Sequence, residues 1–456
     1  MKILWVKANK ILPLYSGGDL RSFNILRQLA VREQVIFFSY YDGPVDEEYE
    51  KKLQEQIPGS VCVSTGRRQT SFVARGIDYM RRLPDAAPYA VSRFASGKVR
   101  DRLKSCLSEQ RPDVVVCDFL DAAINFPERL AVPSVLFQHN VESEIWRRHA
   151  TNGAIGVRKL IYGLEFSKML RYEQGVVTRF DHVIAVSEHD KNLMSAWVEP
   201  ERVTVVPTGV DTEQFCPDKQ PGQEKPLVVF VGAMDWEPNV DAVKYFCEEI
   251  WPLVLAKVPG ARFRIVGRNP DRRVRGLAGP TVEVTGRVPS VVEHLRAAAA
   301  VVVPLRIGGG TRIKIYEAMA VGKAVVSTTV GAEGLDVHHG QNILLCDATD
   351  DFAESVAAML RDEQVRGRLG RAAAELAANY GWPLIGAKFG QILQEIGESL
   401  KVAPSYAQEG ENLNNASQSR REASFRQGNH ESGVLEDGGV KESLDAVEER
   451  ESDGGS

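Results

Sequence analysis

The chain has 456 residues, of which 43% are hydrophobic and 26% are charged, as in an ordinary globular protein with more than one domain. Its six cysteines are scattered without a C-x-x-C pair, which argues against a disulfide framework or a zinc site and favours a reducing compartment. No signal peptide is recognisable, and no apolar run approaches the roughly 20 residues that span a bilayer, so we expect a cytoplasmic protein.

The net charge of −5 is unevenly distributed along the chain. Residues 401–456 contain 12 acidic and 6 basic side chains, so residues 1–400 together carry about +1. The segment 401–456 also has few apolar residues and no sustained periodicity, which predicts a disordered acidic tail. A nearly neutral body without a nucleic-acid-binding motif argues against nucleic acid as a partner.

Short apolar runs alternate with longer amphipathic stretches before the tail. The strand-like runs are KILWVKA, QVIFFSY, PDVVVCDF, PSVLFQHN and DHVIAVS in the first half, and PLVVFVGAM, ARFRIVGR, VEVTGRV, AAVVVPL and KAVVSTTV in the second. Such runs, separated by helical patterns, are typical of parallel sheets covered on both faces. Two sets predict an α/β protein with two doubly wound, Rossmann-like domains, at residues 1–206 and 207–381.

Three features of the first domain attract attention in chain order. Gly17 and Gly18 precede a helical pattern, although a simple turn before a core helix explains them equally well. Residues 66–105 contain ten Lys/Arg against three Asp, with interleaved aromatic residues. This segment is either a solvated basic face or a surface attracted to an anionic membrane or a lipid-diphosphate acceptor. His139 follows a predicted strand, where a histidine is either structural or well placed for chemistry.

A glycine-rich motif, PLRIGGGTRIKIYEAMAVGKAVVST, occupies residues 304–328 of the second domain. A strand leads into Gly308, Gly309 and Gly310, and Thr311 is a suitable N-cap for a helix that runs to about Val321. A strand, a glycine loop and a helix together direct free backbone N–H groups at a phosphate.

Two cations and a carboxylate follow these glycines. Arg312 and Lys314 are slightly unfavourable at a helix N-terminus, but a bound diphosphate would make them counter-ions. Glu317 lies one turn beyond Lys314 and could accept both hydroxyls of a ribose. The alternative is a glycine-eased turn followed by a Lys314–Glu317 pair.

The motif resembles the donor site of retaining glycosyltransferases with the GT-B fold, and most closely glycosyltransferase family 4. Bacterial exopolysaccharide-type members carry GGGTR-x-K-x-x-EAMA. The resemblance covers about residues 1–400, because GGDLRSFNILRQLA, FQHNVES, AVSEHD, VVPTGVD, FVGAMDWEPNVDAV, FRIVGRNP and GAEGL agree in the same order.

In the second domain, the resemblance implies that Glu317 holds the nucleotide ribose. The family's first glutamate, which touches the donor sugar, would fall at Gly309 and is absent. The family's phosphate-binding Arg and Lys are also absent from GAMDWEPN, which contains Gly232, so Arg312 and Lys314 are inferred to replace them.

In the first domain, the resemblance places Gly17, Gly18 and Arg21 beside the donor phosphates and the acceptor. It places His139 near the donor sugar, where it orients and does not act as a nucleophile. Arg21 and Asp118 are the candidate acceptor contacts.

The resemblance therefore implies a retaining, metal-independent glycosyltransferase. It would transfer a sugar from a nucleotide-diphosphate sugar to a glycan or lipid-linked glycan in exopolysaccharide or cell-surface polysaccharide synthesis. No D-x-D metal motif is evident, and no cofactor is expected besides the nucleotide-sugar co-substrate. In the family, a segment like 382–400 crosses back onto the first domain. The alternatives are another GT-B enzyme, such as a nucleotide-sugar 2-epimerase or a phosphorylase, and a catalytically inactive binding subunit.

Overall fold

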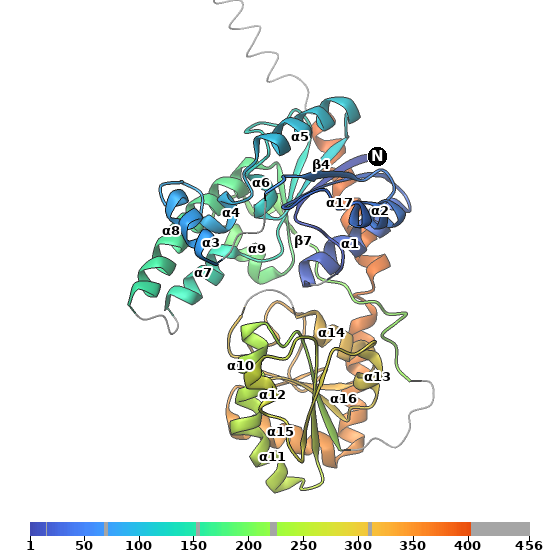
Figure 1. Cartoon of the computed structure of the whole chain (residues 1–456). Helices are drawn as coiled ribbons and strands as arrows, with labels where there is room; N and C mark the ends of the chain where they lie inside the picture. Colours follow the sequence, from blue (N-terminus) through green and yellow to red (C-terminus); the bar gives the residue numbers. More distant parts are fainter. Residues whose placement is uncertain (15, 68–71, 152–155, 219–225, 309–311, 403–456) are drawn as a thin grey trace, which may run out of the picture. The chain divides into compact units, whose positions relative to one another are not determined.

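The computed structural model describes residues 1–14, 16–67, 72–151, 156–218, 226–308 and 312–402. Residues Met1–Ser399 form one compact unit, which contains two parallel sheets (Figure 1). The expected disordered tail lies outside the described residues from residue 403 onward, and so do Gly309, Gly310 and Thr311.

The first sheet has seven parallel strands in the order β3-β2-β1-β4-β5-β6-β7. The strands are β1 (Lys2–Ala8), β2 (Gln34–Tyr41), β3 (Val61–Ser64), β4 (Val114–Asp118), β5 (Ser134–Phe137), β6 (His182–Ala185) and β7 (Val203–Val205). The five predicted strands are all present. The two that were not predicted, β3 and β7, are short strands at the two edges of the sheet, where a long apolar run is not required.

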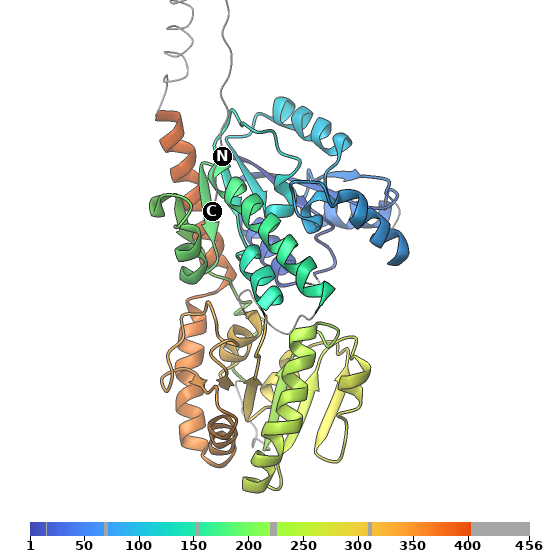
Figure 2. The ribbon, with the colours of Figure 1, turned by 90° about the vertical axis from the view of Figure 1, so that its left-hand side faces the viewer.

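The second sheet has six parallel strands in the order β10-β9-β8-β11-β12-β13. They are β8 (Leu227–Val231), β9 (Arg262–Val266), β10 (Val282–Gly286), β11 (Ala300–Val303), β12 (Ala324–Ser327) and β13 (Leu344–Leu345). Figure 2 shows this sheet with helices on both faces. Only the two-residue β13 was not predicted, and the fold class of two doubly wound α/β domains is confirmed.

Helices connect the strands and cover both faces of each sheet. Those of the first domain are α1 (Gly17–Ala30), α2 (Glu47–Gln56), α3 (Phe72–Arg82), α4 (Tyr89–Ser92), α5 (Gly97–Gln110), α6 (Leu120–Ala123), α7 (Glu142–Thr151), α8 (Val157–Arg179), α9 (Glu188–Met194) and η1 (Pro200–Arg202). Those that follow are α10 (Glu237–Tyr245), η2 (Phe246–Ile250), α11 (Trp251–Lys257), α12 (Arg272–Arg275), α13 (Val292–Arg296), α14 (Ile313–Ala320), α15 (Thr349–Arg361), α16 (Glu363–Ala378) and α17 (Trp382–Val402). Within these described helices, none is long and apolar enough to cross a membrane.

The last helix, α17, shares a hydrophobic core with the first sheet, not with the second. Trp382, Ile385 and Phe389 belong to the buried cluster that contains Trp5 of β1. The Phe389 ring lies 5.3 Å from that of Trp5 and 5.0 Å from that of Phe137. The chain therefore leaves the first domain after β7, builds the second sheet and returns to the first core.

The strand order determines where a ligand can bind. Each sheet reverses its direction of winding once, between β1 and β4 in the first and between β8 and β11 in the second. Ligands of open parallel sheets bind outside the carboxyl ends of the strands at such switch points. Asp118 ends β4, and Gly232 directly follows β8.

Candidate functional site

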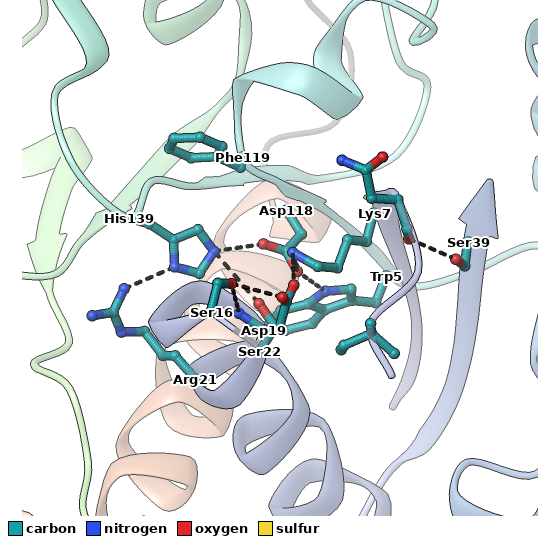
Figure 3. A network of polar contacts seen from close by, with 12 residues as sticks. Trp5, Lys7, Ser16, Asp19, Arg21, Ser22, Ser39, Asp118, Phe119 and His139 are labelled. Carbon is teal, nitrogen blue, oxygen red and sulfur yellow. Dashed lines mark hydrogen bonds and ion pairs between the residues drawn. The ribbon is translucent and has the colours of Figure 1, made fainter. Parts of the chain in front are cut away.

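A buried carboxylate, Asp118, organises the end of the first sheet (Figure 3). The residue is 1% exposed, and its Oδ2 accepts a hydrogen bond from Trp5 Nε1 at 2.9 Å. Lys7 Nζ lies 3.4 Å from the same oxygen, and His139 Nε2 lies 2.6 Å from Oδ1. Burial alone would raise the pKa of Asp118, but the charge of Lys7 and the contact with His139 outweigh it and hold the pKa below its usual value. Asp118 is therefore ionised, and both of its carboxylate oxygens contact side chains of the protein.

The imidazole of His139 is bonded at both nitrogens. Arg21 Nη1 lies 2.8 Å from His139 Nδ1. Because a guanidinium only donates, Nδ1 accepts, and the ring proton sits on Nε2 and is donated to Asp118. Burial lowers the pKa of His139 to about 4 despite the attraction of Asp118, so the ring is neutral near pH 7. These contacts hold His139 in one tautomer and one orientation.

Arg21 connects three segments that are distant in sequence. It lies in α1 and is 3% exposed, and its Nε donates to Thr208 Oγ1 at 3.3 Å. Thr208 follows β7 and His139 follows β5. Burial lowers the pKa of Arg21 to about 10, so the side chain still carries its charge at neutral pH.

The N-terminus of α14 differs from the prediction in one respect. The helix begins at Ile313, and Arg312 occupies the N-cap position with non-helical φ −91° and ψ 81°. The prediction that the helix follows directly after Thr311 is therefore wrong by one residue, and the proposed cap itself lies outside the described residues. The predicted stop is present, because Gly322 follows the helix with φ 75°.

Lys314 reaches from α14 to the end of β8. Its Nζ donates to Asn239 Oδ1 at 2.8 Å and lies 4.3 Å from the centre of the Phe230 ring. Burial, followed by the charge of Arg312, lowers the pKa of Lys314 to about 7. A Cβ at Gly232 would lie 2.8 Å from Lys314 Nζ and 2.6 Å from Asn239 Nδ2. The lysine thus occupies space that a side chain at position 232 would take.

Arg312 and Glu317 complete the second-domain part of the motif. The Arg312 guanidinium is buried and lies 5.9 Å from the Trp236 ring, and burial lowers its pKa to about 10. Burial raises the pKa of Glu317 to about 7, against the attraction of Lys314. Among the described residues, the Glu317 carboxylate makes no hydrogen bond or ion pair, so the alternative Lys314–Glu317 pair is not formed.

A cavity of about 760 Å³ collects most of these residues. Of the predicted site, it is lined by Gly17, Gly18, Arg21, Asp118, His139, Gly232, Arg312 and Lys314. Gly308 and Glu317 are not part of its lining. Its volume lies in the range of small-molecule sites. The structure therefore brings the Gly17–Gly18 loop of the first domain and the N-terminus of α14 in the second to one cavity.

Several lining residues were not predicted from the sequence, among them Lys7, Phe119, Asp121, Trp236, Asn239 and Arg268. Lys7 could have been found, because a lysine within the apolar run KILWVKA is unusual in a buried strand. Asp121 and Asn239 gave no such signal. Among the described residues, no group of three or more His, Cys, Asp or Glu side chains could hold a metal ion.

Both domains match models of known families. Residues 23–214 match the family described as Glycosyltransferase Family 4, and residues 225–362 match the family described as Glycosyl transferases group 1.

Two relatives illustrate the sequence similarity. The chain is 29% identical over 248 residues to a D-inositol 3-phosphate glycosyltransferase of Kribbella flavida. This alignment covers 46% of this chain and 56% of that protein. The chain thus spans little more than half the length of this relative. It is 22% identical over 373 residues to an uncharacterised 44.6 kDa protein in the cps region of Klebsiella pneumoniae, covering 78% of this chain and 90% of that protein.

The fold is that of solved structures with low sequence identity. The HepE protein of Anabaena, solved in complex with UDP and glucose, superposes with a TM-score of 0.59 at 16% identity. The match covers 86% of this chain and 99% of that one.

Proposed function

We propose that this chain, a glycosyltransferase by the families of both its domains, transfers a sugar from a nucleotide-diphosphate sugar to a hydroxyl of a glycan or lipid-linked glycan. The observation that carries the proposal is the pair of cations, Arg312 and Lys314, at the second switch point beside Gly232. A leaving diphosphate develops negative charge, and fixed cations in a partly dry site stabilise that charge strongly. The UDP bound by the Anabaena relative agrees with such a donor.

The transfer we propose retains the anomeric configuration. A bond forms between the acceptor oxygen and the anomeric carbon on the face from which the diphosphate leaves. The bond between that carbon and the phosphate oxygen breaks, and the acceptor proton passes to the departing phosphate. Arg312 and Lys314 neutralise the diphosphate, so we expect the reaction to need no metal ion or other cofactor.

The remaining glycines, Glu317, His139 and Arg21 also have a place in this proposal. The N-terminus of α1, with Gly17 and Gly18, faces the cavity and favours an anion. The Gly308 loop and Glu317 would serve the nucleotide, with Glu317 on the ribose. His139 and Arg21 would orient the donor sugar and the acceptor as one rigid unit.

The cellular setting is also a proposal. The relative encoded in a cps region favours a role in exopolysaccharide or cell-surface polysaccharide synthesis. The basic segment 66–105, with exposed Arg75 and Arg81 on α3, would hold the protein at an anionic inner membrane face, where lipid-linked acceptors lie.

A panel of UDP-, GDP- and dTDP-sugars tests the proposal. We expect hydrolysis or transfer with one donor, an unchanged rate in EDTA, and a product of the same anomeric configuration by NMR. Inversion would contradict retention, and 2-epimerisation of the free nucleotide sugar would favour the epimerase. Binding of nucleotide without any turnover would favour the inactive binding subunit.

A further inference from the structure

The turn after β4 holds an unusual backbone conformation at the cavity wall. Phe119 has φ 78° and ψ 166°, a region that is nearly restricted to glycine. Its backbone N–H donates to the Phe137 carbonyl at 2.9 Å, and its carbonyl accepts from the Ala122 N–H at 3.3 Å. Such conformations cluster at ligand-binding sites, because they persist only where the surroundings impose them.

The ring of Phe119 contributes apolar surface to the cavity. It is partly exposed, and its edge-on contact with His139 places the ring centres 5.4 Å apart. Because His139 is bonded at both nitrogens, the two rings form a fixed wall (Figure 3). An aromatic ring in such a wall can pack against the C–H face of a sugar.

Asp121 lies two residues further on, in α6, and lines the same cavity. Within the described part of the chain, no hydrogen bond or ion pair involves its carboxylate, whereas its backbone carbonyl accepts from the Tyr40 hydroxyl at 3.0 Å. The other two acids of the first domain that line the cavity are occupied: Asp19 accepts from Ser16, and Asp118 from Trp5 and His139. Burial raises the pKa of Asp121 to about 6, against the charges of Arg93 and Lys7, so it is ionised near pH 7.

We propose that Phe119 and Asp121 form the acceptor subsite, and that the Asp121 carboxylate accepts a hydrogen bond from a hydroxyl of an uncharged sugar or polyol. This inference rests on the proposed function and adds the class of acceptor. A hydroxyl satisfies an unpartnered carboxylate, whereas a phosphate beside it would be repelled. Arg21 and Asp118, the expected acceptor contacts, are both bonded to His139, and we propose Asp121 in addition to them.

The test compares Asp121→Asn with the wild type and with Asp101→Asn, a matched control at an exposed position on α5. The acceptors are methyl glycosides of glucose, galactose, mannose and N-acetylglucosamine, together with myo-inositol and D-inositol 3-phosphate. We expect the wild type to prefer an uncharged acceptor. Asp121→Asn should lower kcat/KM for that acceptor by about tenfold or more, as for loss of a charge-assisted hydrogen bond. UDP affinity should stay unchanged in both variants, and Asp101→Asn should also keep the wild-type transfer rate.

Equal kcat/KM in Asp121→Asn and the wild type would overturn the proposal, and so would a wild type that uses only the inositol phosphate. If no donor is turned over, saturation-transfer-difference NMR of the same acceptors with UDP-saturated protein gives the answer. A glycoside or myo-inositol signal that Asp121→Asn loses supports the subsite, and a signal that persists, or no signal in the wild type, overturns it. Failure of the proposed function is distinguishable, because it would appear as absence of turnover in every variant alike.

Discussion

Arg312 and Lys314 are single residues whose proposed role is open to direct measurement. Replacing either by Ala should weaken nucleoside-diphosphate binding by about 1.5–3 kcal/mol, because a charge-assisted hydrogen bond to phosphate is lost. Calorimetry with UDP measures this loss. Arg306→Ala is the matched control, since Arg306 precedes the same loop but pairs with Asp241 and does not line the cavity. Unchanged affinity in both cavity variants would contradict the phosphate role.

Lys314 should also make nucleotide binding depend on pH. Burial lowers the pKa of Lys314 to about 7 in the free protein, and a neighbouring diphosphate favours the charged form and raises this pKa. Binding therefore takes up a proton, and UDP affinity falls as the pH rises above about 7. Calorimetry in two buffers of different ionisation enthalpy measures the uptake.

Two variants distinguish the contribution of Lys314 to this proton uptake from that of the titratable Glu317. Glu317, whose pKa burial raises to about 7, lies one turn further along α14 and attracts Lys314, and the other nearby charge is Arg312. Lys314→Arg keeps its positive charge near pH 7 and should abolish the proton uptake that accompanies UDP binding. Glu317→Gln should retain the proton uptake that is due to Lys314. Uptake that persists in Lys314→Arg would assign it to another group.

At the scale of elements, β8 and α14 meet through a glycine. Gly232→Ala should displace Lys314 and Asn239 and weaken UDP binding by an amount comparable to Lys314→Ala, since its Cβ would fall within 3 Å of both side chains. The folded state should survive, because the lysine is a long side chain that can move. Gly260→Ala is the control, because a Cβ at that position would have no atom within 4 Å. Equal UDP affinity in the two variants would show that Lys314 need not lie there.

The hydrophobic pattern of the sequence predicts some of these elements and misses others. Central strands such as β1 and β11 are buried on both faces and carry continuous apolar runs, so the sequence identifies them. Edge strands such as β7 and β13 need only a few residues and give no comparable signal. Helix α14 was recognisable from its glycines and Gly322, but its first residue depends on the backbone angles of Arg312, which the sequence does not encode locally.

At the scale of the whole molecule, the return of α17 to the first core has consequences for truncation. Removing residues 405–456 should change the melting temperature by no more than about two degrees and preserve transfer, because that segment has no core-forming periodicity. Removing residues 382–456 also removes Trp382 and Phe389 from the core around Trp5 and should abolish transfer. Thermal melts and donor turnover of both truncations measure this. A large loss in the short truncation, or full activity in the long one, would contradict it.

The global fold was predictable because two sets of buried strands leave few alternatives. The contacts within the site were not. Arg21 meets His139 across 118 positions and Thr208 across 187, and Lys314 meets Asn239 across 75. Such pairs depend on how complete domains fold, so a motif can indicate the loops of a site but not which side chains bond one another.

The hydrogen bonds at both ring nitrogens of His139 also affect its reactivity. An acylating reagent such as diethyl pyrocarbonate needs an accessible imidazole nitrogen with a free lone pair, and in His139 that lone pair accepts from Arg21. His189 and His338, whose side chains are 49% and 61% exposed, have no such protection. Peptide mapping of the labelled protein should therefore find carbethoxylation at these two histidines before His139, and Arg21→Met should make His139 reactive. The histidine nearest to the proposed chemistry would then be among the least nucleophilic in the protein.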